Sequence, residues 1–205
     1  DTKSPTLLGH AITHAVQRAG IEPDRIEDAV MGSVLTAGTA GSNIARQAVL
    51  AAGLPATVAA QTIDRQCASG LMAIATAAKQ VMVDGMEVVL AGGQENISAV
   101  QNRYFEWVSA EQDANVLARA PHAYMPMLQT AEFVSRKYGI SRDAQDQYAL
   151  ESQQRTARAQ AEGRLDGEIV PITTQMLVTD KVTGETSHKQ VTLAKVPEKP
   201  DPGLI

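Results

Sequence analysis

The feature that most constrains the fold is an alternation of short apolar runs with helical patterns over the first half of the chain. Buried strands are expected where apolar residues run without a helical period, at 27–34, 56–63 and 87–93. Helices are expected where apolar residues recur at helical spacing, at 7–20, 42–53 and 68–85. This order favours right-handed crossovers and a parallel sheet, so the predicted fold class is α/β. The helix over 68–85 is apolar nearly all round, so we expect it to be buried.

The second half of the chain has a different pattern. From residue 98 to 127 the periodicity is lost, and the segment is predicted to be irregular. Two helices are then expected at 129–139 and 141–163, joined at Gly139, with Ser141 as a cap. Short β-like pieces follow at 168–172, 176–180 and 189–195. We therefore predict an α/β domain over 1–98 and a mixed α+β insertion over 99–205.

Composition narrows the classes of function. The 205 residues are 44% hydrophobic and 20% charged, with a net charge of −5 and no long run of either sign. Neither a nucleic-acid footprint nor a membrane-binding patch is indicated, and no apolar stretch approaches the roughly 20 residues needed to span a bilayer. The single cysteine cannot form an internal disulfide, which favours a cytoplasmic location. The start has no signal-peptide pattern.

Cys67, the only cysteine, raises the main question about function. It lies between an apolar strand-like run and the helix that begins in "CASGLMA". A thiol at a helix N-terminus faces the positive end of the helix dipole, which stabilises the thiolate, and small neighbours allow a ligand to approach closely. Free cysteines are, however, often inert and buried in a core. The residues alone leave both interpretations open, with the core thiol favoured.

Other candidate motifs have plainer explanations. His10 and His14 lie four residues apart, but Ala11 stands where a metalloprotease helix needs a glutamate, so a solvated helix face is favoured over a metal site. The glycine-rich loop 32–43 matches no phosphate-binding fingerprint, and the basic cluster 135–142 is typical of a solvated helix end. Tyr104 and its aromatic neighbours Phe105 and Trp107 are expected to anchor an irregular segment.

Several stretches taken together resemble one family, the thiolases (acetyl-CoA acetyltransferase and 3-ketoacyl-CoA thiolase). They are "VLTAGTAGSNIARQAVLAAGLP", "QCASGLMA", "VVLAGGQENIS", "TAEFVSRKYGISRDAQDQYALESQQR" and "EIVPI", in family order from about residue 7 to 172. Ketoacyl synthases share the cysteine-bearing fold but lack the block over 129–172, which disfavours them. The resemblance implies a thiolase-like layered α/β domain, incomplete here, with an inserted mixed α+β loop domain over 99–205 that contacts coenzyme A.

The resemblance also implies an activity and its residues. The nucleophile of the family's C-x-S-G motif maps onto Cys67, which reverses the preference for a core thiol. The implied reaction forms or cleaves 3-ketoacyl-CoA through an acyl-cysteine, with acetyl-CoA acetyltransferase favoured over a degradative 3-ketoacyl-CoA thiolase. Met127 aligns with a family methionine near the acyl pocket. Coenzyme A thioesters are the expected partners and substrates, no cofactor or metal is expected, and a homodimer or homotetramer is implied.

The chain also departs from the family pattern. Family members carry a histidine in Gly-His-Pro, which activates the nucleophile, and a second cysteine in C-x-G, which acts as acid and base; neither motif occurs here. The family's first strand and the last strand of its first domain have no counterpart either, so we expect part of a longer protein, inactive in turnover alone. A non-catalytic subunit that binds coenzyme A or assists assembly remains the alternative from another class.

Five polar residues also fit family positions, and we interpret them as buried groups satisfied by hydrogen bonds rather than as catalytic residues. They are Asn43, Arg46, Gln47, Glu95 and Asn96.

Overall fold

The fold was described from a computed structural model, in which residues 2–194 are placed. Within this range the chain forms two compact units. The first comprises the residues up to Tyr104 together with Ile172–Leu193, and the second comprises Phe105–Pro171. The predicted boundary at residue 98, between an α/β domain and an inserted loop domain, concerns the domains of the family and stays a prediction.

The core of the first unit is a three-stranded parallel sheet, as the sequence predicted. Its strands are β1 (Asp28–Gly32), β2 (Ala59–Ile63) and β3 (Val89–Gly93), in the order β2-β1-β3. Gly32 pairs with Ile63 on one side and with Gly93 on the other, so the three carboxyl ends lie at one edge. Every residue of the central strand β1 is buried.

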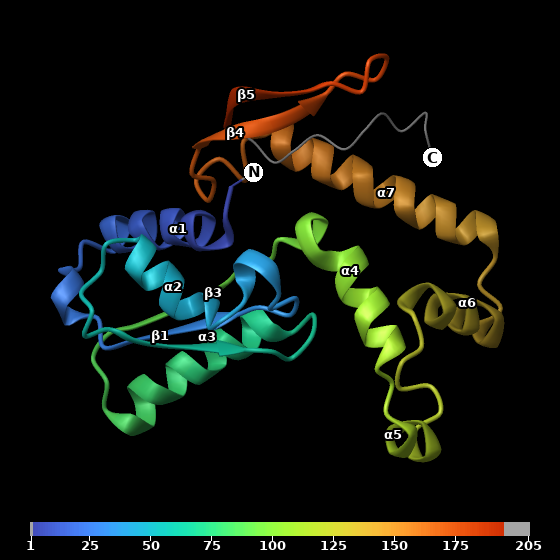
Figure 1. The fold of residues 1–205 in the computed structure, drawn as a ribbon, viewed down its shortest axis with the longest axis horizontal. Helices are drawn as coiled ribbons and strands as arrows, with labels where there is room; N and C mark the ends of the chain where they lie inside the picture. Colours follow the sequence, from blue (N-terminus) through green and yellow to red (C-terminus); the bar gives the residue numbers. More distant parts are fainter. Residues whose placement is uncertain (1, 195–205) are drawn as a thin grey trace. The chain divides into compact units, whose positions relative to one another are not determined.

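Helices cover both faces of this sheet and make three layers (Figure 1). Helices α1 (Ser4–Ala19) and α2 (Ile44–Ala51) lie on one face, and α3 (Ser69–Lys79) lies on the other. Side chains alternate along β1 accordingly. Ala29 and Met31 join the core formed with α1 and α2, whereas Val30 packs with Ala73 and Ala77 of α3. The predicted α/β class is confirmed.

Helix α3 corrects one expectation from the sequence. It continues as a single π-helical turn, Gln80–Asp84, and only the side facing the sheet is buried. Leu71 is 72% exposed and Met82 is 82% exposed. The expectation of a helix buried all round is therefore wrong, because the described residues pack against only one side of it.

The second half of the chain is more regular than predicted. Helices α4 (Ile97–Ala110) and α5 (Ala114–Arg119) occupy most of the segment expected to be irregular. The Asp113 carboxylate starts α5 by accepting the N–H groups of Asn115 and Val116, at 2.7 and 3.0 Å. Pro121 and Pro126 lie in the connection after α5, where they interrupt no helix.

The two helices expected after this segment are confirmed as α6 (Met127–Tyr138) and α7 (Arg142–Ala161). Gly139 ends α6 in the left-handed conformation, and the Ser141 hydroxyl caps α7 by accepting the Ala144 N–H at 3.2 Å. In the described part of the chain, no helix has the length and apolar character needed to cross a membrane.

The last described elements are β4 (Ile172–Thr179) and β5 (Thr186–Leu193), which form an antiparallel hairpin. The pieces expected at 176–180 and 189–195 fall largely within it, although residue 195 lies outside the described residues. The prediction of a strand at 168–172 is wrong except for residue 172, where β4 begins. Pro171 has no N–H to donate to the hydrogen bonds between strands. In the hairpin turn, backbone N–H groups of Thr183 and Val182 hold the pKa of Asp180 below its ordinary value.

Candidate active site

Cys67 lies in the turn that joins β2 to α3, beyond the carboxyl end of the sheet. Strand β2 ends at Ile63, and α3 begins at Ser69 with Ala68 as its N-cap. Strand-to-helix turns gather at this edge of a parallel sheet, which is why ligand sites commonly form there. The predicted placement of Cys67, at a strand-turn-helix junction and next to a helix N-terminus, is confirmed.

Two glycines bring the first turn of α3 onto the ends of β1 and β3. A Cβ atom at Gly32 would lie 2.4 Å from the Ser69 carbonyl carbon and 2.6 Å from the Gly70 nitrogen. A Cβ atom at Gly93 would lie 3.1 Å from the Gly32 carbonyl oxygen. Only a residue without a side chain fits at Gly32, because the neighbouring atoms belong to backbone. The turn that carries Cys67 is thus seated directly against the sheet.

The backbone of this turn has an uncommon conformation. Gln66, immediately before Cys67, has a φ of 50°, in the left-handed region that non-glycine residues rarely adopt. The Gln66 N–H donates to the Asp64 carboxylate at 2.9 Å, and the Ala68 N–H donates to the Arg65 carbonyl at 3.1 Å. Local hydrogen bonds therefore hold the chain in a tight reversal on the N-terminal side of α3.

The Cys67 thiol is free and exposed. The interpretation of Cys67 as a packed core residue is therefore wrong. An exposed thiol in a fixed turn can meet a ligand, and its thiolate form is a nucleophile toward carbonyl carbon.

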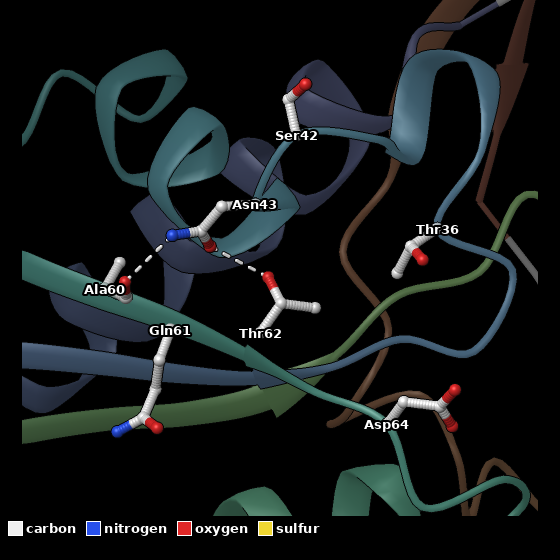
Figure 2. Close-up of a pocket in the computed structure, with 7 residues that line it drawn as sticks. All are labelled: Thr36, Ser42, Asn43, Ala60, Gln61, Thr62 and Asp64. Atoms are coloured by element: carbon white, nitrogen blue, oxygen red, sulfur yellow. Dashed lines mark hydrogen bonds between the residues drawn. The ribbon is translucent and has the colours of Figure 1, made fainter.

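A pocket of about 510 Å³ lies beside the same end of β2. Its lining comes from the loop before α2, from β2 and from the turn after it: Thr36, Ser42, Asn43, Ala60, Gln61, Thr62 and Asp64. Figure 2 shows the Asn43 amide between β2 and α2, with its nitrogen directed at the Ala60 carbonyl and its oxygen at the Thr62 hydroxyl. These bonds measure 3.0 and 2.8 Å. Asn43 therefore ties α2 to the edge of the sheet.

The predicted hydrogen bonds are present for the four polar residues whose side-chain bonds are described, and their non-catalytic role stays a prediction. Besides its bonds to β2, Asn43 caps α2 through the Arg46 N–H. The Arg46 guanidinium donates to the carbonyls of Ala56 and Val58. Gln47 donates to the carbonyls of Gly41 and Ser42, at 2.7 and 2.9 Å.

Glu95 follows β3 and accepts the backbone N–H groups of Val34 and Leu35. Asn96 lines a smaller pocket of about 340 Å³ near the start of α1. The five residues are less buried than expected, and Asn43 is exposed. Their hydrogen bonds nonetheless go mainly to backbone, as a structural role requires.

The remaining predicted residues lie apart from this turn in the sequence. Met127 is the first residue of α6 in the second unit and is 78% exposed, and its predicted place at an acyl pocket stays a prediction. His10 and His14 lie on α1 with ring centroids 4.7 Å apart, in an edge-on contact. Arg142, in the basic cluster, is paired with Asp146 at 2.8 Å on α7, and this ion pair raises the pKa of Arg142.

The aromatic group at residues 104–107 lies on helix α4 rather than in an irregular segment. Trp107 is 66% exposed there. Among residues 2–194, no group of three or more histidine, cysteine or acidic side chains is arranged to hold a metal ion.

Two contributors to the turn, Ser69 and Gly32, are not indicated as such by the sequence. The glycine at the end of a buried strand, opposite a Ser-Gly pair at a helix start, was the available signal for close backbone approach. No pattern along the chain indicated that Ser69 would turn its hydroxyl back out of the helix.

Comparisons with known proteins identify a matching family model and similar proteins. The family model of the thiolase N-terminal domain matches residues 1–198. An acetyl-CoA acetyltransferase of Cupriavidus necator is 41% identical over 194 residues, covering 90% of this chain and 49% of that protein. A 3-ketoacyl-CoA thiolase of Bacillus subtilis is 38% identical over 172 residues, covering 83% of this chain and 43% of that protein.

A solved structure is also similar. The crystal structure of the Bacillus anthracis acetyl-CoA acetyltransferase matches with a TM-score of 0.70 and 34% identity, over 95% of this chain and 48% of that chain. The chain therefore spans about half the length of the relatives it matches.

Proposed function

This chain belongs to the thiolase family, and on that premise we propose that its protein transfers acyl groups between coenzyme A thioesters as an acetyl-CoA acetyltransferase. The observation that carries the proposal is the single cysteine, exposed in the turn between β2 and α3. Cys67 stands in the family's C-x-S-G motif, and the turn around it is held by hydrogen bonds and by contact with the sheet.

In the proposed first step the Cys67 thiolate attacks the carbonyl carbon of acetyl-CoA. The carbon–sulfur bond to coenzyme A breaks, coenzyme A leaves as a thiolate that takes a proton, and an acetyl thioester remains on Cys67. In the second step another acetyl-CoA loses a proton from its α-carbon. The resulting carbanion attacks the acetyl-cysteine, which forms acetoacetyl-CoA and returns Cys67 as a thiolate. The chemistry requires no metal or prosthetic group, because sulfur itself carries the acyl group.

Both steps need groups that move protons. Residues 1–205 contain one cysteine and four histidines, none of them in a Gly-His-Pro motif. We therefore place the general acid and base in the portion of the relatives that this chain does not span. Taken alone, residues 1–205 should accept an acyl group without sustained turnover.

Finer parts of the proposal rest on the family resemblance. They are that an inserted loop domain over 99–205 contacts coenzyme A, that Met127 lies near the acyl group, and that the protein is a homodimer or homotetramer. A cytoplasmic location is part of the same proposal, because a lone cysteine needs no oxidising compartment. A degradative 3-ketoacyl-CoA thiolase is the second candidate, since the similar Bacillus subtilis protein has that name.

Labelling of Cys67 tests the proposal. In the full-length protein, iodoacetamide should modify Cys67 faster than a free thiol, and saturating acetyl-CoA should protect it. Incubation with acetyl-CoA should add one acetyl group to the peptide that contains Cys67. Cys67→Ser should abolish the formation of acetoacetyl-CoA, with Ser109→Ala on the exposed surface of α4 as the matched control.

Three results would count against the proposal. An unprotected thiol that reacts like free cysteine would refute the nucleophilic role. Binding of acetyl-CoA without any acyl-cysteine would favour the non-catalytic subunit. Multiple turnovers by residues 1–205 alone would show that an acid or base within them, with His122 as the first suspect, had been overlooked.

A further inference from the structure

Ser69 makes contacts that an ordinary helix-starting serine does not make. It is the first residue of α3, two positions after Cys67, and it is only 4% exposed. Its hydroxyl donates to the Gln66 carbonyl at 2.6 Å and accepts the Arg65 N–H at 2.8 Å. A single buried side chain thus bonds to the two residues that immediately precede the cysteine.

These bonds differ from helix capping. A capping serine accepts an N–H from the second or third residue of its own helix. At the start of α3 the N-cap residue is Ala68, and no side chain caps the helix. The Ser69 hydroxyl instead reaches backward, out of the helix and into the turn.

The bonds act on a conformation that is otherwise unfavourable. Gln66 has a φ of 50°, so its backbone lies in the left-handed region, which is unfavourable for a residue with a side chain. The Ser69 hydroxyl binds the N–H on one side of this reversal and the carbonyl on the other. The Ser69 backbone N–H also donates to the Gln66 carbonyl, at 3.0 Å. Removal of the hydroxyl would take its partner from the Arg65 N–H and remove two of the bonds that hold the reversal.

Gly32 fixes where Ser69 stands. The Ser69 carbonyl group and the Gly70 nitrogen lie against the Gly32 Cα, within 2.6 Å of where a Cβ atom would be. Ser69 is therefore a link between the sheet and the turn, held by backbone contact on one side and bonded through its side chain on the other.

We propose that Ser69 is a positioning residue for Cys67, and that its hydroxyl sets the direction from which the thiolate meets an acyl carbonyl. The inference rests on the proposed function, because a thiol that never accepts an acyl group needs no such alignment. Displacements of about 1 Å can cost about 100-fold in rate when reacting atoms must be aligned. Ser69 itself bonds to backbone and does not touch the reacting atoms.

The test compares two reactions of Cys67 in the full-length protein. Transfer of an acetyl group from acetyl-CoA requires alignment, whereas alkylation by iodoacetamide, a small mobile reagent, requires little. In Ser69→Ala, acetyl transfer to Cys67 should fall by about 10- to 100-fold, with an unchanged KM for acetyl-CoA. The alkylation rate at its high-pH plateau should stay within about threefold of wild type. Ser69→Thr keeps a hydroxyl and should restore most of the acetyl transfer.

The outcomes separate this inference from the proposed function. Wild-type protein that forms no acetyl-cysteine would overturn both. If the wild-type protein is acetylated and Ser69→Ala is acetylated at the same rate, the inference alone is overturned. The same holds if Ser69→Thr and Ser69→Ala lose the rate of acetyl transfer to the same extent. If Ser69→Ala does not fold, as judged by circular dichroism, Ser69→Cys replaces it, because a thiol of similar size forms weaker hydrogen bonds. Acetyl transfer to Cys67 in Ser69→Cys, located by fragmentation of the peptide, should lie clearly below wild type, and a wild-type rate would overturn the inference.

Discussion

Among single residues, Gly32 has the clearest steric requirement near Cys67. It pairs with Ile63 and Gly93 in the sheet while the first turn of α3 rests on its Cα atom. Close contact between a strand end and a helix start is possible only where one side lacks a side chain. The position of Cys67 thus depends on the absence of an atom at Gly32 as well as on the bonds of Ser69.

Replacement of Gly32 should separate the helix from the strand. Gly32→Ala should lower the free energy of unfolding by about 1–3 kcal/mol, because backbone rather than a flexible side chain must move. It should also slow acetyl transfer to Cys67. Urea unfolding followed by circular dichroism measures the first effect in the full-length protein.

Gly70→Ala is the matched control for this substitution. A Cβ atom at Gly70 would have nothing within 4 Å, and alanine in a helix is worth up to about 1 kcal/mol over glycine. Equal stability of the Gly32→Ala and Gly70→Ala proteins would contradict the steric account.

Among the secondary-structure elements, α2 shows how one side chain can both cap a helix and bond to a sheet edge. Asn43 caps the helix, bonds to the Ala60 carbonyl and accepts the Thr62 hydroxyl (Figure 2). Its φ of 56° is left-handed, a conformation that asparagine tolerates better than most residues. One residue therefore provides the cap, the tie to β2 and the backbone turn.

Substitutions at Asn43 should separate these contributions. Asn43→Ala should lower the free energy of unfolding by about 2–4 kcal/mol, from the lost cap and bonds and from alanine in a left-handed conformation. Asn43→Gly keeps the backbone freedom and loses only the side-chain bonds, so it should be less destabilising by about 1 kcal/mol. Thermal and urea unfolding of both variants measure the difference. A glycine variant less stable than the alanine variant would contradict this division.

For the whole molecule, the outstanding feature is the apolar face of α3 that points away from the sheet. Leu71 and Ile74 of α3 are exposed, as is Met82 in the π-helical turn that follows it, although α3 buries Ala73 and Ala77 on its other side. Exposed apolar patches of this kind mark interaction surfaces or sites of aggregation. When residues 1–205 are isolated, we expect this exposed apolar face to promote self-association.

The isolated chain should therefore bind a hydrophobic dye or self-associate. Leu71→Lys combined with Ile74→Lys should reduce dye fluorescence and aggregation, because each removes apolar surface from one patch. Val182→Lys is the control, since Val182 is 95% exposed as a single residue in the turn of the β4–β5 hairpin. A monodisperse, cooperatively melting wild-type chain that binds no dye would contradict the expectation. Dye fluorescence and light scattering provide the measurements.

Most of the fold could be predicted from the sequence where local patterns are strong. Helices α1 and α2 follow apolar periodicity, and the three parallel strands follow short apolar runs. Helices α6 and α7 follow their end signals, and Gly20, Gly139 and Ser141 behave as expected at helix ends. Helices α4 and α5 were missed because aromatic residues and prolines obscured a weak helical period. For α5, the Asp113 cap marks where the helix begins.

For the candidate site, too, part could be predicted from the sequence and part could not. The residue types in "QCASGLMA" determined by themselves that a thiol follows a strand and precedes a helix, because apolar period and small residues are local properties. Only the tertiary structure decided that Cys67 is exposed, that Gly32 supports the turn and that the Ser69 hydroxyl faces backward. It also decided that one face of α3 is exposed. The contact of Gly32 with Ser69 joins segments more than 30 residues apart, and no pattern within one segment records such a contact. The Ser69 bonds are local, but they depend on the left-handed conformation of Gln66, which the residue types do not indicate.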